Sequence, residues 1–145
     1  MVQIILDALE HRQQHRDFTL YAYVILENHL HMVAQAPNLS KEIASFKGWT
    51  ARLLIDALQA QGAKRILKQL AMHKPLHKTD RHYQLWEEGS QPKQIQTQDM
   101  MRQKVDYIHL NPVKRGYVDK GEYWRYSSAR DYLGEKGLVS VCKTW

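Results

Sequence analysis

The first 37 residues change from a helical to a strand-like hydrophobic pattern. Residues 2–15 place apolar side chains at helical spacing with charged ones between them, which predicts an amphipathic helix without a capping residue. Residues 18–26, FTLYAYVIL, are rich in β-branched and aromatic residues and predict a strand buried on both faces. Residues 29–35, HLHMVAQ, predict its hairpin partner across residues 27–28. Pro37 is expected to end that strand.

The middle of the chain predicts two helices and a short strand. Ser40 is the expected N-cap of a helix that runs toward Gly62. The segment AKRILKQLAMHKP predicts a shorter helix that Pro75 stops. Residues 82–86, HYQLW, indicate a short strand, and residues 87–94, EEGSQPKQ, indicate a loop by their Gly, Ser and Pro content.

The C-terminal third predicts a further helix followed by turns. Thr97 is the expected cap of this helix, and Pro112 is expected to halt it. Gly116 and Gly121 indicate turns, and a last short helix is expected to begin near Ser127. Helices combined with a few antiparallel strands on one sheet predict an α+β fold.

Length and composition predict a single domain, 1–145, and its charge favours an acidic partner. The chain has 145 residues, of which 43% are hydrophobic, and a formal net charge of +6, which favours a phosphate-bearing partner. Its one cysteine, Cys142, excludes an internal disulfide and a multi-cysteine zinc site. No apolar run approaches the roughly 20 residues of a membrane helix, so we expect a cytoplasmic protein with no membrane partner.

Two histidines interrupt the second predicted strand. His29 and His31 are two residues apart, so on a strand both imidazoles would lie on one face. Two imidazoles on one face form half of a metal site, and with oxygen ligands they can hold Mn²⁺ or Mg²⁺. The alternative is that backbone groups or water satisfy both histidines at a sheet edge.

A tyrosine and an asparagine are paired on the later helix. Tyr107 and Asn111 are four residues apart and would share a helical face. Asn111 precedes Pro112, so this pairing lies at a helix end and could be displaced. Tyr107 could instead be a core aromatic residue whose hydroxyl reaches the surface. His109 would face away from Tyr107 on a regular helix.

Basic side chains are concentrated in two segments. Between residues 63 and 81, six Lys and Arg side chains accompany a single acid, which suits phosphate contact but equally suits a solvated helix face. Nearby Trp86 could stack on bases or pack in the core. Two further basic residues follow Tyr107 closely and are better placed to meet a phosphate. The candidate phosphate contacts are therefore Lys64, Arg65, Lys68, Lys114 and Arg115.

Four ordered segments resemble a known family. YVILENHLHM, YQLWEEGSQPKQ, DYIHLNPVKRGYV and EYWRYSSARDYLG occur in this order and at about this spacing in single-tyrosine transposases of the HUH superfamily. The resemblance is greatest to the REP-associated tyrosine transposases and covers roughly residues 2–134. Four ordered motifs are far more specific than H-x-H alone.

The resemblance implies a reaction and a role for each motif residue. His29, His31 and Asn111 correspond to the ligands of a divalent metal, Mg²⁺ or Mn²⁺, and Tyr107 corresponds to the nucleophile. Family members cut single-stranded DNA beside a hairpin and remain joined to the 5′ phosphate through tyrosine. The implied fold is a central antiparallel sheet in a ferredoxin-like arrangement, flanked by helices.

The chain also departs from the family pattern. Many members have a proline where this chain has Glu27, and members usually begin with a strand before the first helix, whereas this sequence opens inside that helix. We therefore expect a sheet without its usual first strand, whose open edge a second copy could cover as a homodimer. The rival function is a hairpin DNA-binding protein that has lost its chemistry. A relaxase or replication initiator with the same histidine pair is disfavoured by the short chain and by the segment YIHLNPVKRG.

Overall fold

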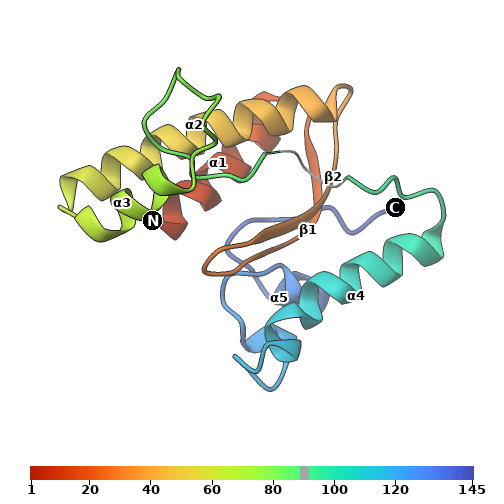
Figure 1. The fold of residues 1–145 in the computed structure, drawn as a ribbon. Helices are drawn as coiled ribbons and strands as arrows, with labels where there is room; N and C mark the ends of the chain where they lie inside the picture. Colours follow the sequence, from red (N-terminus) through yellow and green to blue (C-terminus); the bar gives the residue numbers. More distant parts are fainter. Residues whose placement is uncertain (89–91) are drawn as a thin grey trace.

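The computed structural model describes residues 1–88 and 92–145, which form three layers around a β-hairpin (Figure 1). On one side of the hairpin lie the first three helices; α4 lies on the other side, with the short C-terminal helices beside it. The predicted α+β fold is confirmed. In chain order the elements are α1 (Val2–His15), β1 (Thr19–Ile25), β2 (Leu30–Gln35), α2 (Leu39–Ala60), α3 (Lys64–Met72), α4 (Gln98–Lys114), the 3₁₀ turn η1 (Gly121–Tyr123) and α5 (Ala129–Tyr132).

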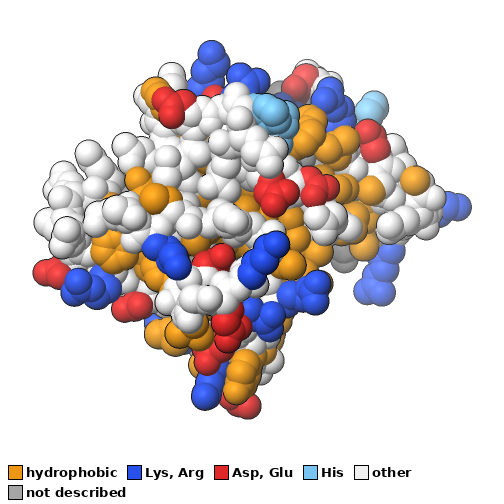
Figure 2. Space-filling model, turned by 180° about the vertical axis from the view of Figure 1, so that it is seen from behind, with side chains coloured by type: hydrophobic (Ala, Val, Ile, Leu, Met, Phe, Trp, Pro, Cys, Tyr) orange, Lys and Arg blue, Asp and Glu red, His pale blue; other side chains and the backbone are white. Residues whose placement is uncertain are grey.

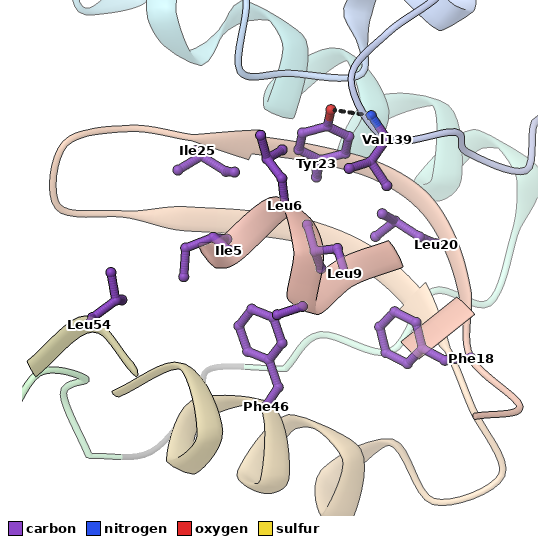
Figure 3. Close-up of a cluster of buried hydrophobic side chains, with 11 residues drawn as sticks. Ile5, Leu6, Leu9, Phe18, Leu20, Tyr23, Ile25, Phe46, Leu54 and Val139 are labelled. Carbon is purple, nitrogen blue, oxygen red and sulfur yellow. Dashed lines mark hydrogen bonds between the residues drawn. The ribbon is translucent and has the colours of Figure 1, made fainter. Parts of the chain in front are cut away.

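Strand β1 is buried on both faces, as its continuous apolar run predicted. Its side chains at Leu20, Tyr23 and Ile25 pack with α1 and α2 in one core cluster (Figure 3). Ala22 and Val24 pack with α4 in a second cluster. A strand covered on both faces has no solvent side, which explains why FTLYAYVIL shows no polar alternation.

A β-bulge at Tyr21 sets which residues face each layer. Leu20 pairs with Ala34 across the antiparallel hairpin, but Ala22 pairs with Val33, so Tyr21 is an extra residue in β1. One inserted residue shifts the alternation of side chains, and this is why Leu20 and Ala22 face opposite layers. The Tyr21 hydroxyl donates a hydrogen bond to the Gln35 side chain at 2.8 Å.

The two edges of the hairpin differ. The outer edge of β1 is hydrogen-bonded to C-terminal segments through Ile25 N to Tyr126 O at 2.8 Å and Cys142 N to Leu20 O at 2.8 Å. The outer edge of β2 receives no backbone hydrogen bond from any other segment that the structure describes. This open edge agrees with the expected absence of a first strand, and its coverage by a second copy remains a prediction.

Two predictions in the middle of the chain are wrong. The N-cap of α2 is Asn38 rather than Ser40, and its side chain accepts a hydrogen bond from Lys41 N at 3.1 Å. Residues 82–86 form no strand. Trp86 instead donates its indole N–H to the Thr50 hydroxyl at 3.0 Å and packs against the core, so side-chain anchoring to α2 replaces strand pairing. The predicted loop 87–94 includes residues 89–91, which lie outside the described part.

Helix α4 begins where predicted but continues through Pro112. The Thr97 hydroxyl caps it by accepting a hydrogen bond from Met100 N at 3.1 Å. Pro112 lies in the last turn, where its missing N–H removes a single hydrogen bond, and Arg115 N still reaches Asn111 O at 3.2 Å. Gly116, with a φ of +73°, ends the helix. The expected halt before Pro112 is therefore wrong, and Asn111 lies within regular helix.

Buried polar groups connect α4 to β1 through Ser128. The Ser128 hydroxyl accepts a hydrogen bond from Tyr23 N at 3.0 Å and lies 2.9 Å from His109 Nε2. Burial lowers the pKa of His109 to about 4, so its imidazole is neutral at pH 7. Its ring also meets Tyr132 edge-on at 5.0 Å. His109, which was expected to face away from Tyr107, is thus a structural link between α4 and β1.

The protonation of His109 predicts a pH-dependent stability. Its pKa is lower in the folded chain than the usual 6.5, so the unfolded chain binds the proton more readily as the pH falls from 6.5 to 4. We expect the free energy of unfolding to fall over this window by up to about 3 kcal/mol from this group. Denaturant unfolding of the wild type and His109→Gln would measure it. An equally steep loss of stability in His109→Gln would contradict the assignment.

Candidate active site

The histidine pair lies at the turn end of the hairpin, on the side of α4. His31 is in β2 opposite Val24, whereas His29 precedes the strand and its carbonyl accepts a hydrogen bond from Leu26 N at 2.8 Å. The two imidazole rings are 5.9 Å apart between centroids, with their planes inclined by 24°. His29 is therefore a turn residue rather than a strand residue, but the two rings still lie side by side.

Tyr107 projects from α4 toward this pair. Val105 and Ile108 on the same helix are buried against β1, which fixes the rotation of α4 over the hairpin. The Tyr107 ring meets the His31 ring edge-on, with centroids 5.7 Å apart and planes inclined by 82°. Its side chain remains 45% exposed, so an external ligand can reach the phenol. Three of the four motif residues thus lie next to one another.

The fourth motif residue, Asn111, is buried one helical turn after Tyr107. Its side-chain oxygen accepts a hydrogen bond from Arg115 Nε at 3.2 Å. A carbonyl oxygen has two lone pairs, so this bond leaves one acceptor position unused. Arg115 therefore orients the amide that the sequence pattern places beside the nucleophile.

Lys114 brings a positive charge to the phenol. It follows Tyr107 by two helical turns, and its Nζ lies 5.5 Å from the centroid of the Tyr107 ring. This cation–π geometry holds an ammonium group close to where a phosphate would meet the phenol. Lys114 and Arg115, the two basic residues expected near a scissile phosphate, both contact motif residues.

Electrostatic effects at the site favour a neutral imidazole at His31. Burial lowers the pKa of His31, and the positive charges of His29 and Arg115 lower it further. At neutral pH, a ring lone pair of His31 is therefore available to a metal or a proton donor.

A second aromatic residue, Tyr117, closes the hairpin turn and was missed from the sequence. Its hydroxyl donates a hydrogen bond to the Glu27 carboxylate, and this bond is the main reason that the pKa of Glu27 is lowered. The Tyr117 ring stacks on Trp124 at 5.5 Å. Glu27 thus occupies the turn as a hydrogen-bonded carboxylate. The only sequence signal for Tyr117 was its place in the motif DYIHLNPVKRGYV.

The basic residues of α3 are far from this site in the fold. Lys64, Arg65 and Lys68 are exposed on α3, which packs against α2 on the opposite side of the hairpin from α4. Figure 2 shows Lys and Arg side chains spread over the rear face with acidic and hydrophobic side chains between them. The structure therefore does not join α3 to Tyr107 in one basic surface, and its contact with DNA remains a prediction.

The expected metal ligands are two imidazoles and one amide, and their metal binding remains a prediction. Within residues 1–88 and 92–145, no group of three or more His, Cys, Asp or Glu side chains is arranged to hold a metal ion. His29, His31 and Asn111, the ligand set that the resemblance implies, differ from such a group because the third side chain is an amide. Two nitrogens and one oxygen suit Mn²⁺ or Mg²⁺ that keeps positions open for a phosphate.

Comparison with known proteins supports the family resemblance. The chain is similar to a Haemophilus influenzae protein with the curated name "Putative REP-associated tyrosine transposase", with 27% identity over 115 residues. These residues are 79% of this chain and 61% of the relative, so the match spans about three-fifths of the relative's length. No family model and no solved structure matches the chain. Among the described residues, no helix is both long and apolar enough to cross a membrane.

The contact between Tyr107 and His31 predicts a measurable titration. Tyr107→Ala uncovers the imidazole and favours its charged form, so the pKa of His31 should rise toward its usual value of 6.5. Tyr107→Phe keeps the ring contact and should leave this pKa unchanged. Proton NMR of the His31 ring against pH, assigned with His31→Gln, would measure both. An unchanged pKa in Tyr107→Ala would show that this contact does not bury His31.

Proposed function

We propose that this chain is a metal-dependent tyrosine transposase that nicks and rejoins single-stranded DNA at hairpin-flanked sites through a 5′-phosphotyrosine intermediate. The observation that carries the proposal is the edge-on contact of Tyr107 with His31, beside the His29 ring. It brings a solvent-accessible phenol to a histidine pair, although the two motifs are about 75 residues apart in the sequence. The similarity to the Haemophilus influenzae protein supports the same reaction class.

The tyrosine suits strand transfer because its phosphate ester conserves the cleaved bond. The Tyr107 oxygen attacks phosphorus, the Oη–P bond forms and the P–O3′ bond breaks. The phenol loses its proton, and the departing 3′ oxygen takes up a proton to become a hydroxyl. A 3′ hydroxyl can later attack the same phosphorus and expel the tyrosine, which restores a phosphodiester without ATP.

The residues present fit a divalent cation. His29, His31 and Asn111 would hold it, since burial keeps the His31 imidazole neutral and the Asn111 oxygen retains an acceptor position. When bound, a divalent metal supplies Lewis-acid polarisation of the phosphate. The chain's own contribution is orientation: α4 fixes the phenol over β2, and Arg115 fixes the amide.

Lys114 and Arg115 would place the scissile phosphate. The Lys114 ammonium lies over the Tyr107 ring, and the Arg115 guanidinium bonds to Asn111 one turn from it. Both cations can meet the negative charge of a phosphate approaching the phenol, and a charge-assisted hydrogen bond is about twice as strong as a neutral one. These two residues are therefore the proposed phosphate-positioning groups.

One observation favours the rival function, a hairpin DNA-binding protein without chemistry. The Asn111 oxygen is buried and already bonded to a cation, Arg115. If Arg115 stays in place when DNA binds, the third metal ligand is weakened, because a guanidinium would lie close to the metal. The rival then predicts hairpin binding that is independent of metal and gives no cleavage.

We expect the wild-type protein to form a covalent adduct with hairpin-flanked single-stranded DNA in Mg²⁺ or Mn²⁺. Tyr107→Phe should abolish the adduct because it removes the attacking oxygen, and EDTA should abolish it by removing the metal. Tyr117→Phe is the matched control, since it removes an exposed phenol near the same turn and should keep the adduct. A denaturing gel measures all four conditions.

Two outcomes of this experiment contradict the proposal. An adduct that survives Tyr107→Phe would show that another residue is the nucleophile. A native-gel shift of the hairpin that needs no metal, with no adduct under any condition, would favour the rival binding function.

Lys114 provides a second test. Lys114→Gln should slow adduct formation by about tenfold, which corresponds to the loss of one favourable charge near the phosphate. Lys120→Gln is the matched control because Lys120 also lies over an aromatic ring, that of Tyr123, at 5.8 Å. Single-turnover rates of adduct formation compare the two variants. Equal rates for Lys114→Gln and wild type would remove Lys114 from the proposed mechanism.

A further inference from the structure

A pocket lies between α1 and α2, on the opposite side of the hairpin from Tyr107. Its volume is about 410 Å³, which is within the usual range for ligand sites. None of its lining residues takes part in the proposed reaction. Its lining includes His11, Arg12 and Arg16 from the α1 side and Gly48, Trp49 and Arg52 from α2.

Arg12, at the wall of this pocket, is buried with one donor unused. Its side chain bonds to Glu42 Oε2 at 2.5 Å through Nη1 and to the Ser45 hydroxyl at 3.2 Å through Nη2. The residue is only 5% exposed, yet its Nε–H is buried and has no hydrogen-bond partner within the described residues. Held by its bonds to Glu42 and Ser45, the Arg12 guanidinium forms part of the pocket wall, with its charge offset by the Glu42 carboxylate.

Two further cations give the pocket a positive charge. Arg16 and Arg52 line it and are exposed, and neither forms an ion pair with a described residue. The Glu42 carboxylate offsets only Arg12. An anion that can accept several guanidinium hydrogen bonds, such as a phosphate, therefore fits these arginines better than a neutral molecule does.

Aromatic surface lies beside these cations. The rings of His11 and Trp49 are 5.8 Å apart, inclined by 38°. Gly48, the neighbour of Trp49, has open space where a side chain would begin, so the wall of the pocket is not filled there. Cations that meet a backbone phosphate, together with an aromatic ring on which a base can stack, are the features of single-strand binding sites.

We propose that this pocket binds one nucleotide unit of single-stranded DNA, with its phosphate on Arg16 and Arg52 and its base on the Trp49 or His11 ring. The choice of DNA rests on the proposed function; the nucleoside phosphate chemistry follows from the pocket alone. The site lies across the hairpin from the active site, so it would hold a part of the strand away from the cleaved bond.

Binding of fluorescein-labelled dT12, measured by anisotropy in EDTA, tests the site without cleavage. The double variant Arg16→Gln/Arg52→Gln should bind about tenfold more weakly, and its plot of log affinity against log salt should be flatter by about 0.7, the value for one single-strand phosphate contact. The control is Lys41→Gln/Lys136→Gln, which removes the same charge from exposed residues outside the pocket. Equal losses of affinity in both double variants would overturn the proposal.

A variant that fills the pocket tests the binding site without changing the charge of the protein. Gly48→Leu adds a side chain in the open space of the wall and improves helix propensity, so the protein should remain folded while dT12 binding weakens. A thermal midpoint at or above that of the wild type verifies the fold. Unchanged dT12 affinity in folded Gly48→Leu would contradict the proposed site.

Free nucleotide is the other source of the same chemistry. Calorimetry with dTMP and with inorganic phosphate distinguishes it: binding of dTMP that the arginine variants lose, with unchanged dT12 affinity, would overturn the assignment to a DNA strand. The adduct assay is independent of these results. If the wild type forms no adduct but the pocket variants still lose dT12 affinity, the transposase proposal is overturned and this binding site is supported.

Discussion

Enclosure of strand β1 is the constraint on which the rest of the structure depends. Ala22, Tyr23 and Val24 are completely buried between two helical layers, and both edges of the strand are hydrogen-bonded. The Tyr23 phenol illustrates the environment: it accepts a hydrogen bond from Val139 N at 3.3 Å, and burial raises its pKa to about 12. Because β1 is held on all sides, it fixes the position of β2 along its edge and the position of α4 on one of its faces.

The candidate active site follows from this enclosure. Val24 of β1 pairs with His31, and it also packs in the cluster that holds Ile108 of α4. One buried strand therefore positions both the imidazole and the helix that carries Tyr107. The Ser128 bridge between Tyr23 and His109 connects the same helix to β1 a second time. The ring contact between Tyr107 and His31 is therefore a consequence of the packing of their buried neighbours, Val24 and Ile108.

The hydrophobic periodicity of the sequence predicted the elements that follow a regular pattern. It did not predict features that depend on a single residue. The helix at 2–15 and the hairpin were predicted almost to the residue. The bulge at Tyr21 was not, because an extra residue in a continuously apolar strand leaves no trace in its pattern. Pro112 misled the prediction for α4, since a proline in the last turn of a helix removes only one hydrogen bond.

The candidate site could be predicted as a set of residues but not as a set of contacts. The spacing of His29 with His31 and of Tyr107 with Asn111, together with the family resemblance, selected these residues as candidates, and their roles remain predictions. The bond from Arg115 to Asn111 depends on an unbroken helix to Lys114, which the sequence argued against. The arginine pocket between α1 and α2 had no sequence signal, because its residues come from two helices and share no motif.

The most direct measurement locates the nucleotide on the protein after reaction with hairpin-flanked DNA. Trypsin releases residues 105–114, VDYIHLNPVK, as a peptide in which Tyr107 is the one tyrosine, and residues 116–120, GYVDK, as a peptide that carries Tyr117. After nuclease digestion, we predict a nucleotide phosphate mass on the first peptide, fragmenting to Tyr107. The same mass on the Tyr117 peptide, or on any peptide other than residues 105–114, would contradict the assignment of Tyr107 as the nucleophile.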